Sequence, residues 1–400
     1  MQREEMVARI KEEVAGYKDE MIEFMRDMIS IPSESCEEGE VIERIAEEMN
    51  EVGFDEVFTD EMGNVHGRVG EGDRVLAYDA HIDTVGIGNP DEWDWDPYEG
   101  KFEDGIIYGR GATDQEAAMV SMVYAGKVIK DLGLHEEFSL YFVGTVQEED
   151  CDGLCWEYII NENVLDPELV VITEPTNLNI YRGHRGRMEM KVKTEGVSCH
   201  GSAPERGENS LYRMAKIISG VENLNPDLKV DDFLGKGTVA ATHVINQTPS
   251  LNAIPNQTEL HIDRRLTAGE DKELAVEQIE EIIESEDLEA EVSIPYYDTP
   301  SYTGFKYEME KYYPTWVLDE DHPVIQSAVS AYEDVFDEEP KVDKWTFSTN
   351  GVTIMGRNNI PCVGFGPANE IYAHSVEDQV PVDHLLKAAE FYAHFPYRVE

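Results

Sequence analysis

Four short apolar runs, each followed by acidic residues or histidine, constrain the fold of this chain more than any other feature. The runs span residues 75–78, 138–146, 169–173 and 361–365. Nearly continuous runs of this length are typical of strands that are buried on both faces of a mainly parallel sheet. Helical patterns lie between them, and one begins just after Asp114. Strands that alternate with helices predict an α/β domain.

The middle of the chain has a different pattern, in which apolar and charged residues alternate. Alternation marks strands that have one face open to solvent. We expect four such strands, at 188–194, 239–245, 258–266 and 289–294, and two helices, at 210–221 and 271–283. The order strand, helix, strand, strand, helix, strand is the ferredoxin-like arrangement. The pattern therefore predicts an inserted α+β domain at residues 183–296, with residues 1–182 and 297–400 forming the first domain.

Composition excludes several classes of function. The chain has 84 acidic residues against 32 Lys and Arg, a formal charge of −52. No basic face is therefore available for nucleic acid or for an anionic membrane surface. The charged N-terminus has no signal-peptide pattern and no apolar run approaches the roughly 20 residues that span a bilayer, which favours a cytoplasmic protein. Because the acids are spread over the whole length, we favour adaptation to a salty cytoplasm over an ordinary acidic surface.

Residues that carry chemistry follow the apolar runs. Ligands of open α/β sheets bind beyond the carboxyl ends of the strands. At such places stand His81 and Asp83 after the first run, Glu148 and Glu149 after the second, Glu174 after the third, His374 after the fourth, and Asp114 at the start of a helix. Each of these residues alone has an ordinary explanation, such as a packed histidine or a solvated acidic pair. Together they predict that two imidazoles and several carboxylates converge on one rim of the sheet.

Clustered carboxylates repel one another unless a positive charge lies between them. A divalent metal supplies that charge. Imidazole and carboxylate ligands without a required thiolate fit Zn²⁺, with Co²⁺ or Mn²⁺ as alternatives. One bridging carboxylate, with one histidine and one further carboxylate for each metal, leaves positions open for water and substrate.

The same residues resemble the motifs of a known family. The segments 81–83, 109–114, 148–149, 173–175 and 373–375 are similar, in order, to motifs of the zinc metallopeptidase superfamily of aminoacylase, acetylornithine deacetylase and succinyl-diaminopimelate desuccinylase. Segments 347–351 and 364–367 look closest to its selenium-metabolism-linked hydrolase branch. The resemblance covers nearly the whole chain. It implies an α/β catalytic domain with an inserted ferredoxin-like lid through which two chains form a homodimer.

The resemblance also implies a role for each matching residue of the catalytic domain. One metal would be bound by His81 and Glu174, the second by His374 and Glu149, and Asp114 would bridge the two. Asp83 would orient His81, a support that metal-bound histidine usually has, and Glu148 would be the general base. The family has a cis peptide after the bridging aspartate, so one is expected between Asp114 and Gln115.

Three lid residues match family positions as well. His200 would stabilise the oxyanion, reaching the active site of the partner subunit. Asn252 and Arg264 would bind the substrate's carboxylate, for which the forked guanidinium of arginine is suited. From the residues alone, His200 is a loop histidine near a turn and Arg264 a surface residue of a strand, and the adjacent Arg265 is easily confused with it.

The expected activity is hydrolysis of the amide bond of an N-acyl amino acid or a short peptide, with two divalent metals, Zn²⁺ first among them. The sequence leaves deacylation and peptide cleavage open, because the metal chemistry is identical in both. A non-catalytic metal- or peptide-binding protein of the same fold is the alternative. Such a protein would be expected to lose the base or a ligand, and this chain keeps both.

Overall fold

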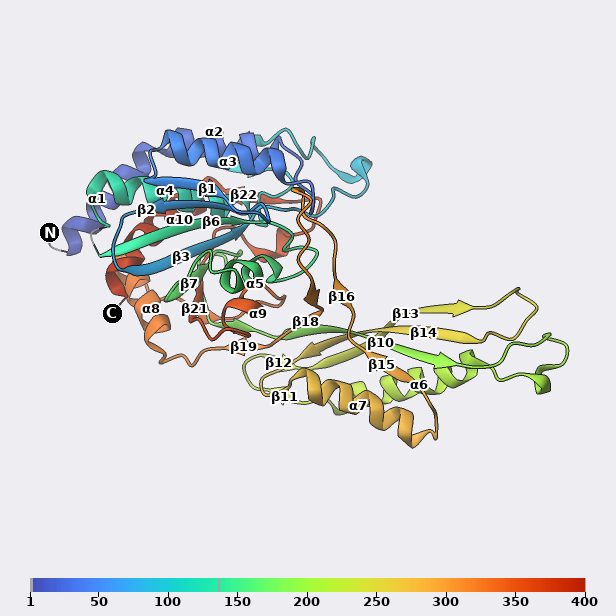
Figure 1. The fold of residues 1–400 in the computed structure, drawn as a ribbon. Helices are drawn as coiled ribbons and strands as arrows, with labels where there is room; N and C mark the ends of the chain where they lie inside the picture. Colours follow the sequence, from blue (N-terminus) through green and yellow to red (C-terminus); the bar gives the residue numbers. More distant parts are fainter. Residues whose placement is uncertain (1–2, 136, 400) are drawn as a thin grey trace.

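The computed structural model describes residues 3–135 and 137–399; residues 1, 2, 136 and 400, which belong to the expected first domain, lie outside the described residues. Figure 1 shows a larger part that contains both ends of the chain and a narrower arm that extends from it. We call the elements from β10 to β15 the arm. The two parts have separate hydrophobic cores.

The larger part is built on an eight-stranded sheet with the order β1-β2-β6-β3-β7-β21-β8-β20. Its strands are β1 (Glu56–Thr59), β2 (Val65–Val69), β3 (Arg74–His81), β6 (Phe138–Thr145), β7 (Leu169–Ile172), β8 (Ile180–Tyr181), β20 (Val342–Asp343) and β21 (Cys362–Gly364). The central strands β6, β3, β7 and β21 are parallel to one another. They coincide with the four apolar runs, so the predicted mainly parallel sheet is confirmed.

Helices and smaller strands surround this sheet. The helices of the larger part are α1 (Arg3–Gly16), α2 (Lys18–Ile29), α3 (Gly39–Glu51), α4 (Glu116–Leu132), α5 (Leu154–Asn161), α8 (Pro323–Phe336), α9 (Gly351–Ile354) and α10 (Val382–His394). A small sheet consists of β4 (Lys101–Glu103), β5 (Ile106–Tyr108) and β22 (Gln379–Pro381). Helix α4 is buried on nearly all sides among α1, α2, α10 and the sheet. It ends at Gly133, whose left-handed φ of 66° suits a glycine that closes a helix.

The arm has the predicted ferredoxin-like order. Its elements are β10 (Gly186–Glu195), α6 (Ser210–Leu224), β11 (Val230–Asp231), β12 (Gly235–Lys236), β13 (Thr238–Gln247), β14 (Gln257–Leu266), α7 (Lys272–Ser285) and β15 (Glu291–Ser293). The sheet order is β13-β14-β10-β15, and every pairing is antiparallel. Burial alternates along β10 and β14, because one face packs on the helices and the other is open. Strand β13 lies at the edge of this sheet.

Short paired strands connect the arm to the larger part. They are β9 (Gly183–His184), β16 (Tyr296–Tyr297), β17 (Met309–Glu310), β18 (Tyr312–Tyr313) and β19 (Trp316–Val317). Strand β9 pairs with β19, β16 with β17, and β18 with β10 of the arm. The outgoing and returning chains therefore lie side by side where they cross between the two parts. Among the described residues, no helix combines the length and apolar character needed to cross a membrane.

Candidate metal centre and active site

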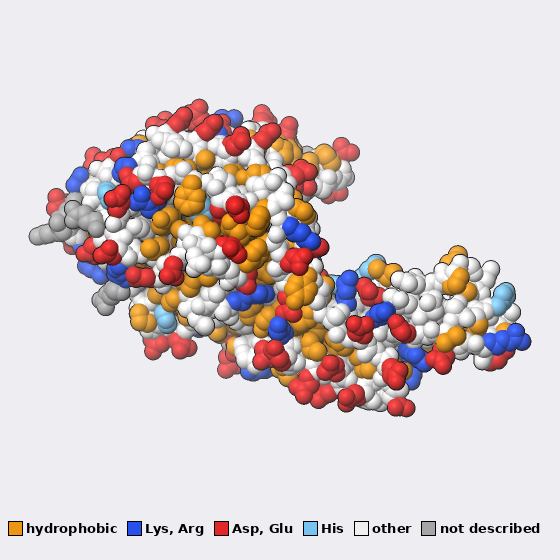
Figure 2. Space-filling model, viewed as in Figure 1, with side chains coloured by type: hydrophobic (Ala, Val, Ile, Leu, Met, Phe, Trp, Pro, Cys, Tyr) orange, Lys and Arg blue, Asp and Glu red, His pale blue; other side chains and the backbone are white. Residues whose placement is uncertain are grey.

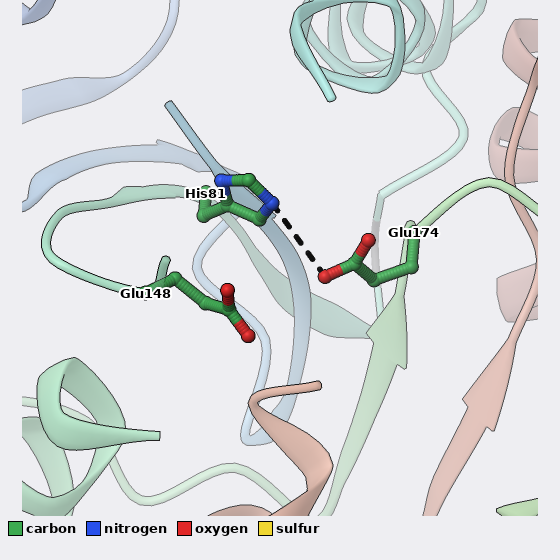
Figure 3. A group of neighbouring side chains, drawn as sticks. All are labelled: His81, Glu148 and Glu174. Carbon is green, nitrogen blue, oxygen red and sulfur yellow. Dashed lines mark ion pairs between the residues drawn. The ribbon is translucent and has the colours of Figure 1, made fainter. Parts of the chain in front are cut away.

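The predicted site residues meet at one edge of the eight-stranded sheet. His81 is the last residue of β3 and lies opposite Thr145, the last residue of β6, in a parallel register. Glu148 comes three residues after Thr145, and Glu174 comes shortly after β7, which is parallel to β3. Because the carboxyl ends of parallel strands share one edge, the side chains of His81, Glu148 and Glu174 converge there, as Figure 3 shows.

His81 directs one ring nitrogen at two carboxylates. Its Nε2 lies 2.9 Å from Oδ1 of Asp114 and 3.6 Å from Oε1 of Glu174, the contact drawn in Figure 3. Its Nδ1 lies 2.9 Å from the backbone carbonyl oxygen of Asp83. A carbonyl oxygen only accepts, so Nδ1 carries a proton, and Nε2 is the nitrogen that can bind a metal.

A second imidazole approaches from the other side. The Nε2 atom of His374 lies 2.9 Å from Oε1 of Glu149 and 3.3 Å from Oδ2 of Asp114. Asp114 therefore stands between two histidines and offers one carboxylate oxygen to each. Two sets of donor atoms lie within 4.8 Å of one another, one from His81, Asp114 and Glu149 and one from His81, Glu148 and Glu174. All five predicted ligands are thus brought together, with Glu148 beside them.

The donor set fits a divalent metal. Oε2 of Glu174 and Oε1 of Glu148 are buried and have no hydrogen-bond partner in the described structure. Burial and the charge of Asp114 raise the pKa of Glu174 well above its ordinary value, and burial does the same to Glu148. Burial lowers the pKa of His81, but the charge of Glu174 and hydrogen bonds to Asp114 and Asp83 outweigh it and raise the net value. The cluster holds acids that ionise together only beside a positive charge.

Asp83 supports more than the histidine it was predicted to orient. Its Oδ1 accepts the backbone N–H of Glu148 at 3.1 Å, and its Oδ2 accepts that of Glu149 at 3.0 Å. Ser35 donates its hydroxyl to Oδ2 at 2.6 Å. Asp83 also contacts Nδ1 of His81 through its own carbonyl oxygen at 2.9 Å and its carboxylate at 3.6 Å. One buried residue therefore positions His81 at the end of β3 and the two glutamates that follow β6.

A buried ion pair joins the loop of Asp114 to the loop of His374. Asp378 accepts hydrogen bonds from the guanidinium of Arg110 at 2.8 Å, from the N–H of Gly111 at 3.0 Å and from the N–H of Thr113 at 2.7 Å. Neither Arg110 nor Asp378 was identified from the sequence. The available signal was the position of each, four residues from a predicted ligand. The expected cis peptide between Asp114 and Gln115 is present.

The cluster opens into a cavity of about 360 Å³ that the arm also lines. Arg187 and Arg265 stand opposite each other on β10 and β14 and contribute two cations to the wall. Asp152 accepts from Arg187 at 3.2 Å and from the hydroxyl of Ser348. The sequence did not single out Arg187, although its place on the open face of an alternating strand was a usable signal.

Arg264 does not face this cavity. It lies on the helix-covered face of β14 and is 1 % exposed. Its guanidinium donates to Oε1 of Glu270 at 2.7 Å and to the backbone oxygen of Arg265 at 2.7 Å. A guanidinium already paired with a buried carboxylate is not free to bind a substrate, so the role predicted for Arg264 needs correction. Its neighbour Arg265 lines the cavity instead.

His200 and Asn252 lie together at the far end of the arm. His200 pairs with Ala253 in a β-bridge, and the carbonyl of Asn252 accepts from the N–H of Gly201 at 2.6 Å. Both residues are exposed, and neither lines the cavity of the same chain. In Figure 1 the loops near residues 200 and 250 form the tip of the arm, away from the larger part. Within one chain the structure therefore does not bring them to the metal cluster.

The chain matches a known family and two known proteins along most of its length. Residues 77–398 match the family described as Peptidase family M20/M25/M40. The chain is 52% identical over 387 residues to the uncharacterized protein YgeY of Escherichia coli (strain K12), covering 97% of this chain and 96% of that protein. It is 23% identical to a probable succinyl-diaminopimelate desuccinylase of Staphylococcus epidermidis, covering 94% and 96% of the two chains.

The fold is shared with solved structures as well. YXEP of Bacillus subtilis, described as a dinuclear metal binding peptidase from the M20 family, superposes with a TM-score of 0.70 at 16% identity, covering 95% of this chain and 98% of that one. The site, the fold and the two sequence matches point the same way. This chain belongs to the peptidase family M20/M25/M40 and is a hydrolase of its metallopeptidase and amidohydrolase type, with a candidate metal-binding group.

Proposed function

We propose that this protein hydrolyses the amide bond of an N-acyl amino acid or a short peptide. It would use two bound divalent cations, for which Zn²⁺ is the first candidate. One cation would be held by His81 and Glu174, the other by His374 and Glu149, and both by Asp114. The observation that carries the proposal is Asp114, whose two oxygens each face a different imidazole at 2.9 and 3.3 Å. The dinuclear description of the Bacillus subtilis neighbour supports it.

Residues of the chain itself would move the proton. When bound, the two cations would activate a water molecule and polarise the scissile carbonyl. Glu148 lies beside the ligand set, so it can take the proton of the attacking water and pass it to the leaving amine. Asp83 holds the backbone of Glu148 and Glu149 through two hydrogen bonds, which fixes the base relative to the ligand that follows it.

Arg265 would bind the carboxylate of the substrate. It lines the cavity next to Arg187, and an arginine pairs with a carboxylate through two parallel hydrogen bonds. Both N-acyl amino acids and peptides end in such a carboxylate. The descriptions of the Staphylococcus epidermidis desuccinylase and the Bacillus subtilis peptidase support one class each.

We also propose that two chains associate through the arm. The long edge strand β13 and the exposed tip that carries His200 and Asn252 support this arrangement. The tip would then reach the cavity of the partner subunit, where His200 would stabilise the oxyanion and Asn252 would contact the substrate. The same arrangement makes residues 183–296 the lid and dimerisation domain.

Glu148→Gln tests the assignment of the base. The amide keeps the size of the side chain but cannot accept the proton, so kcat should fall about 10²- to 10⁴-fold. The measurement is hydrolysis of a panel of N-acyl amino acids and dipeptides by protein loaded with Zn²⁺, Co²⁺ or Mn²⁺, together with metal analysis. Metal content should stay the same, because Glu148 is not among the proposed ligands.

Glu47→Gln is the matched control, because Glu47 is exposed on α3 in the larger part. It should leave both kcat and metal content unchanged. Hydrolysis by Glu148→Gln at the wild-type rate would refute the assignment of the base. A wild-type protein that binds metal but cleaves nothing in the panel would instead favour a binding protein of the same fold.

A further inference from the structure

One buried tyrosine hydroxyl bonds to the residues on both sides of the Glu148-Glu149 pair. The side-chain amide of Gln147 donates to the hydroxyl oxygen of Tyr297 at 3.0 Å. That hydroxyl in turn donates to Oδ2 of Asp150 at 2.9 Å. Gln147 directly precedes Glu148, and Asp150 directly follows Glu149. The Tyr297 hydroxyl therefore links the residue before the two glutamates to the residue after them.

These two hydrogen bonds support a loop in which Gln147 has an unfavourable backbone conformation. Gln147 has a φ of 60°, in the left-handed region that is unfavourable for residues other than glycine. Its N–H donates to Oε1 of the buried Glu38 at 3.1 Å, and its amide also lies 3.3 Å from the backbone oxygen of Thr299. Tyr297 is the only one of these partners that also reaches Asp150 among the described residues. Without the Tyr297 hydroxyl, the side chain of Asp150 loses this hydrogen bond.

Tyr297 lies on the returning connection between the arm and the larger part. Strand β15 of the arm ends at Ser293, and β16, which contains Tyr297, begins three residues later. Along this two-residue strand the side chains alternate, so Tyr297 is 7 % exposed and Tyr296 is 60 % exposed. The buried ring would pack equally well in a phenylalanine. The hydroxyl, however, donates to Asp150 and accepts from Gln147, both in the loop of the two glutamates, and its one other printed contact is with Sγ of Cys36 at 3.7 Å.

We propose that the Tyr297 hydroxyl is a positioning group that fixes residues 147–150 and so sets the carboxylates of Glu148 and Glu149 in the cavity. Asp83 holds the same segment from within, through the N–H groups of the two glutamates. Tyr297 holds it at both ends. The catalytic part of this inference rests on the proposed function of Glu148. The structural part concerns the order of the loop and does not depend on that function.

Tyr297→Phe keeps the ring and removes the hydroxyl, and Tyr296→Phe is its matched control on the same strand. We expect kcat of Tyr297→Phe to fall at least about tenfold while KM stays within about twofold, because the base is displaced but the substrate-binding arginines are not. Hydrogen exchange of a peptide covering residues 146–152 should be faster than in the wild type. Tyr296→Phe should match the wild type in both measurements.

Asp150→Ala, alone and combined with Tyr297→Phe, tests whether the two groups act through one hydrogen bond. The double variant should be no more than about twofold slower than Tyr297→Phe, because neighbours in one network are not additive. An unchanged kcat and unchanged exchange in Tyr297→Phe would overturn the proposal, as would equal effects of both tyrosine variants. Should the wild type cleave no substrate, the proposed function fails, while the exchange comparison still decides the role of Tyr297 in the loop.

Discussion

Arg264 and Arg265 are neighbours on β14, yet their side chains stand on opposite faces of the arm sheet. Successive side chains of a strand alternate, so Arg264 shares the helix-covered face with Leu260 and Ile262, and Arg265 shares the open face. A buried guanidinium is tolerated only with a partner, which here is Glu270 at 2.7 Å. Arg265, which is about one third exposed, bonds Asp263 and lines the cavity.

Variants of the two arginines should therefore have opposite effects. Arg265→Gln should raise KM about tenfold or more with an unchanged melting temperature, because it removes a charged hydrogen bond to the substrate. Arg264→Met should leave KM unchanged in folded protein and lower the free energy of unfolding by about 3–5 kcal/mol, because Glu270 stays buried without its partner. Steady-state kinetics and urea unfolding measure the two effects. A rise of KM in Arg264→Met alone would restore the original assignment.

Residue spacing made part of this site predictable. His81, Glu149, Glu174, His374 and the base Glu148 come at or after the ends of buried parallel strands, whose carboxyl ends meet at one edge, so the apolar runs predicted that they converge. Asp114 precedes helix α4 and does not follow this rule. The same alternation that predicted the strand at 258–266 already placed Arg264 with the apolar residues Leu260 and Ile262. Arg187, Arg110 and Asp378 had only weak local signals in the sequence, because each acts through a contact between segments far apart in the chain.

At the scale of elements, strand β13 is an edge strand of the arm sheet and is exposed along most of its length. Its residues from Ala240 to Gln247 are exposed, and Val244 and Ile245 are apolar. An edge strand presents unpaired backbone groups, and proteins usually cover such an edge or place charges on it. In the proposed dimer the second chain covers it.

Replacing Val244 and Ile245 together by lysine should separate the proposed dimer. Light scattering after size exclusion should give the mass of one chain, against two for the wild type, because two adjacent charges would be desolvated at the contact. Hydrolysis should fall as well, since the tip with His200 would no longer reach a partner. Phe102→Lys, which adds a charge at an exposed apolar site of the larger part, is the control. A wild type that is already a single chain would refute the dimer.

The four central strands, helix α4 and the main strands and helices of the arm were predicted from their periodicity, whereas the connections were not. Strands β16 to β19 have two residues each, which is too short for an alternating pattern to be recognised. Their pairing depends on the packing of the two parts against each other. The sequence therefore predicted the four central strands of the larger sheet and the order of elements in the arm, but not how the connections join the two parts.

At the scale of the whole molecule, acidic side chains are scattered over the visible face of both parts, as Figure 2 shows. With a formal charge of −52, the folded chain repels itself more strongly than the expanded unfolded chain does. We propose that this protein is adapted to a salty cytoplasm. Salt shortens the distance over which exposed charges repel one another, from about 10 Å at 0.1 M to about 3 Å at 1 M.

The melting temperature should therefore rise with KCl into the molar range. Differential scanning calorimetry of metal-loaded protein measures it, with sucrose at matched water activity as the control for exclusion effects that do not involve charge. The rise in KCl should exceed the rise in sucrose. A flat response to KCl would remove the proposed adaptation while leaving the enzyme assignment intact.

The outgoing and returning chains are paired where the arm leaves the larger part, through β9 with β19 and β10 with β18. The two paired backbones form a narrow connection, which bends far more easily than it stretches. We infer that the arm moves most easily by rotating about this connection. Tyr297 lies on the same returning chain and packs in the core of the larger part, so movement of the arm would act on the anchor of residues 147–150. Closing over a substrate and seating the base would then be a single movement.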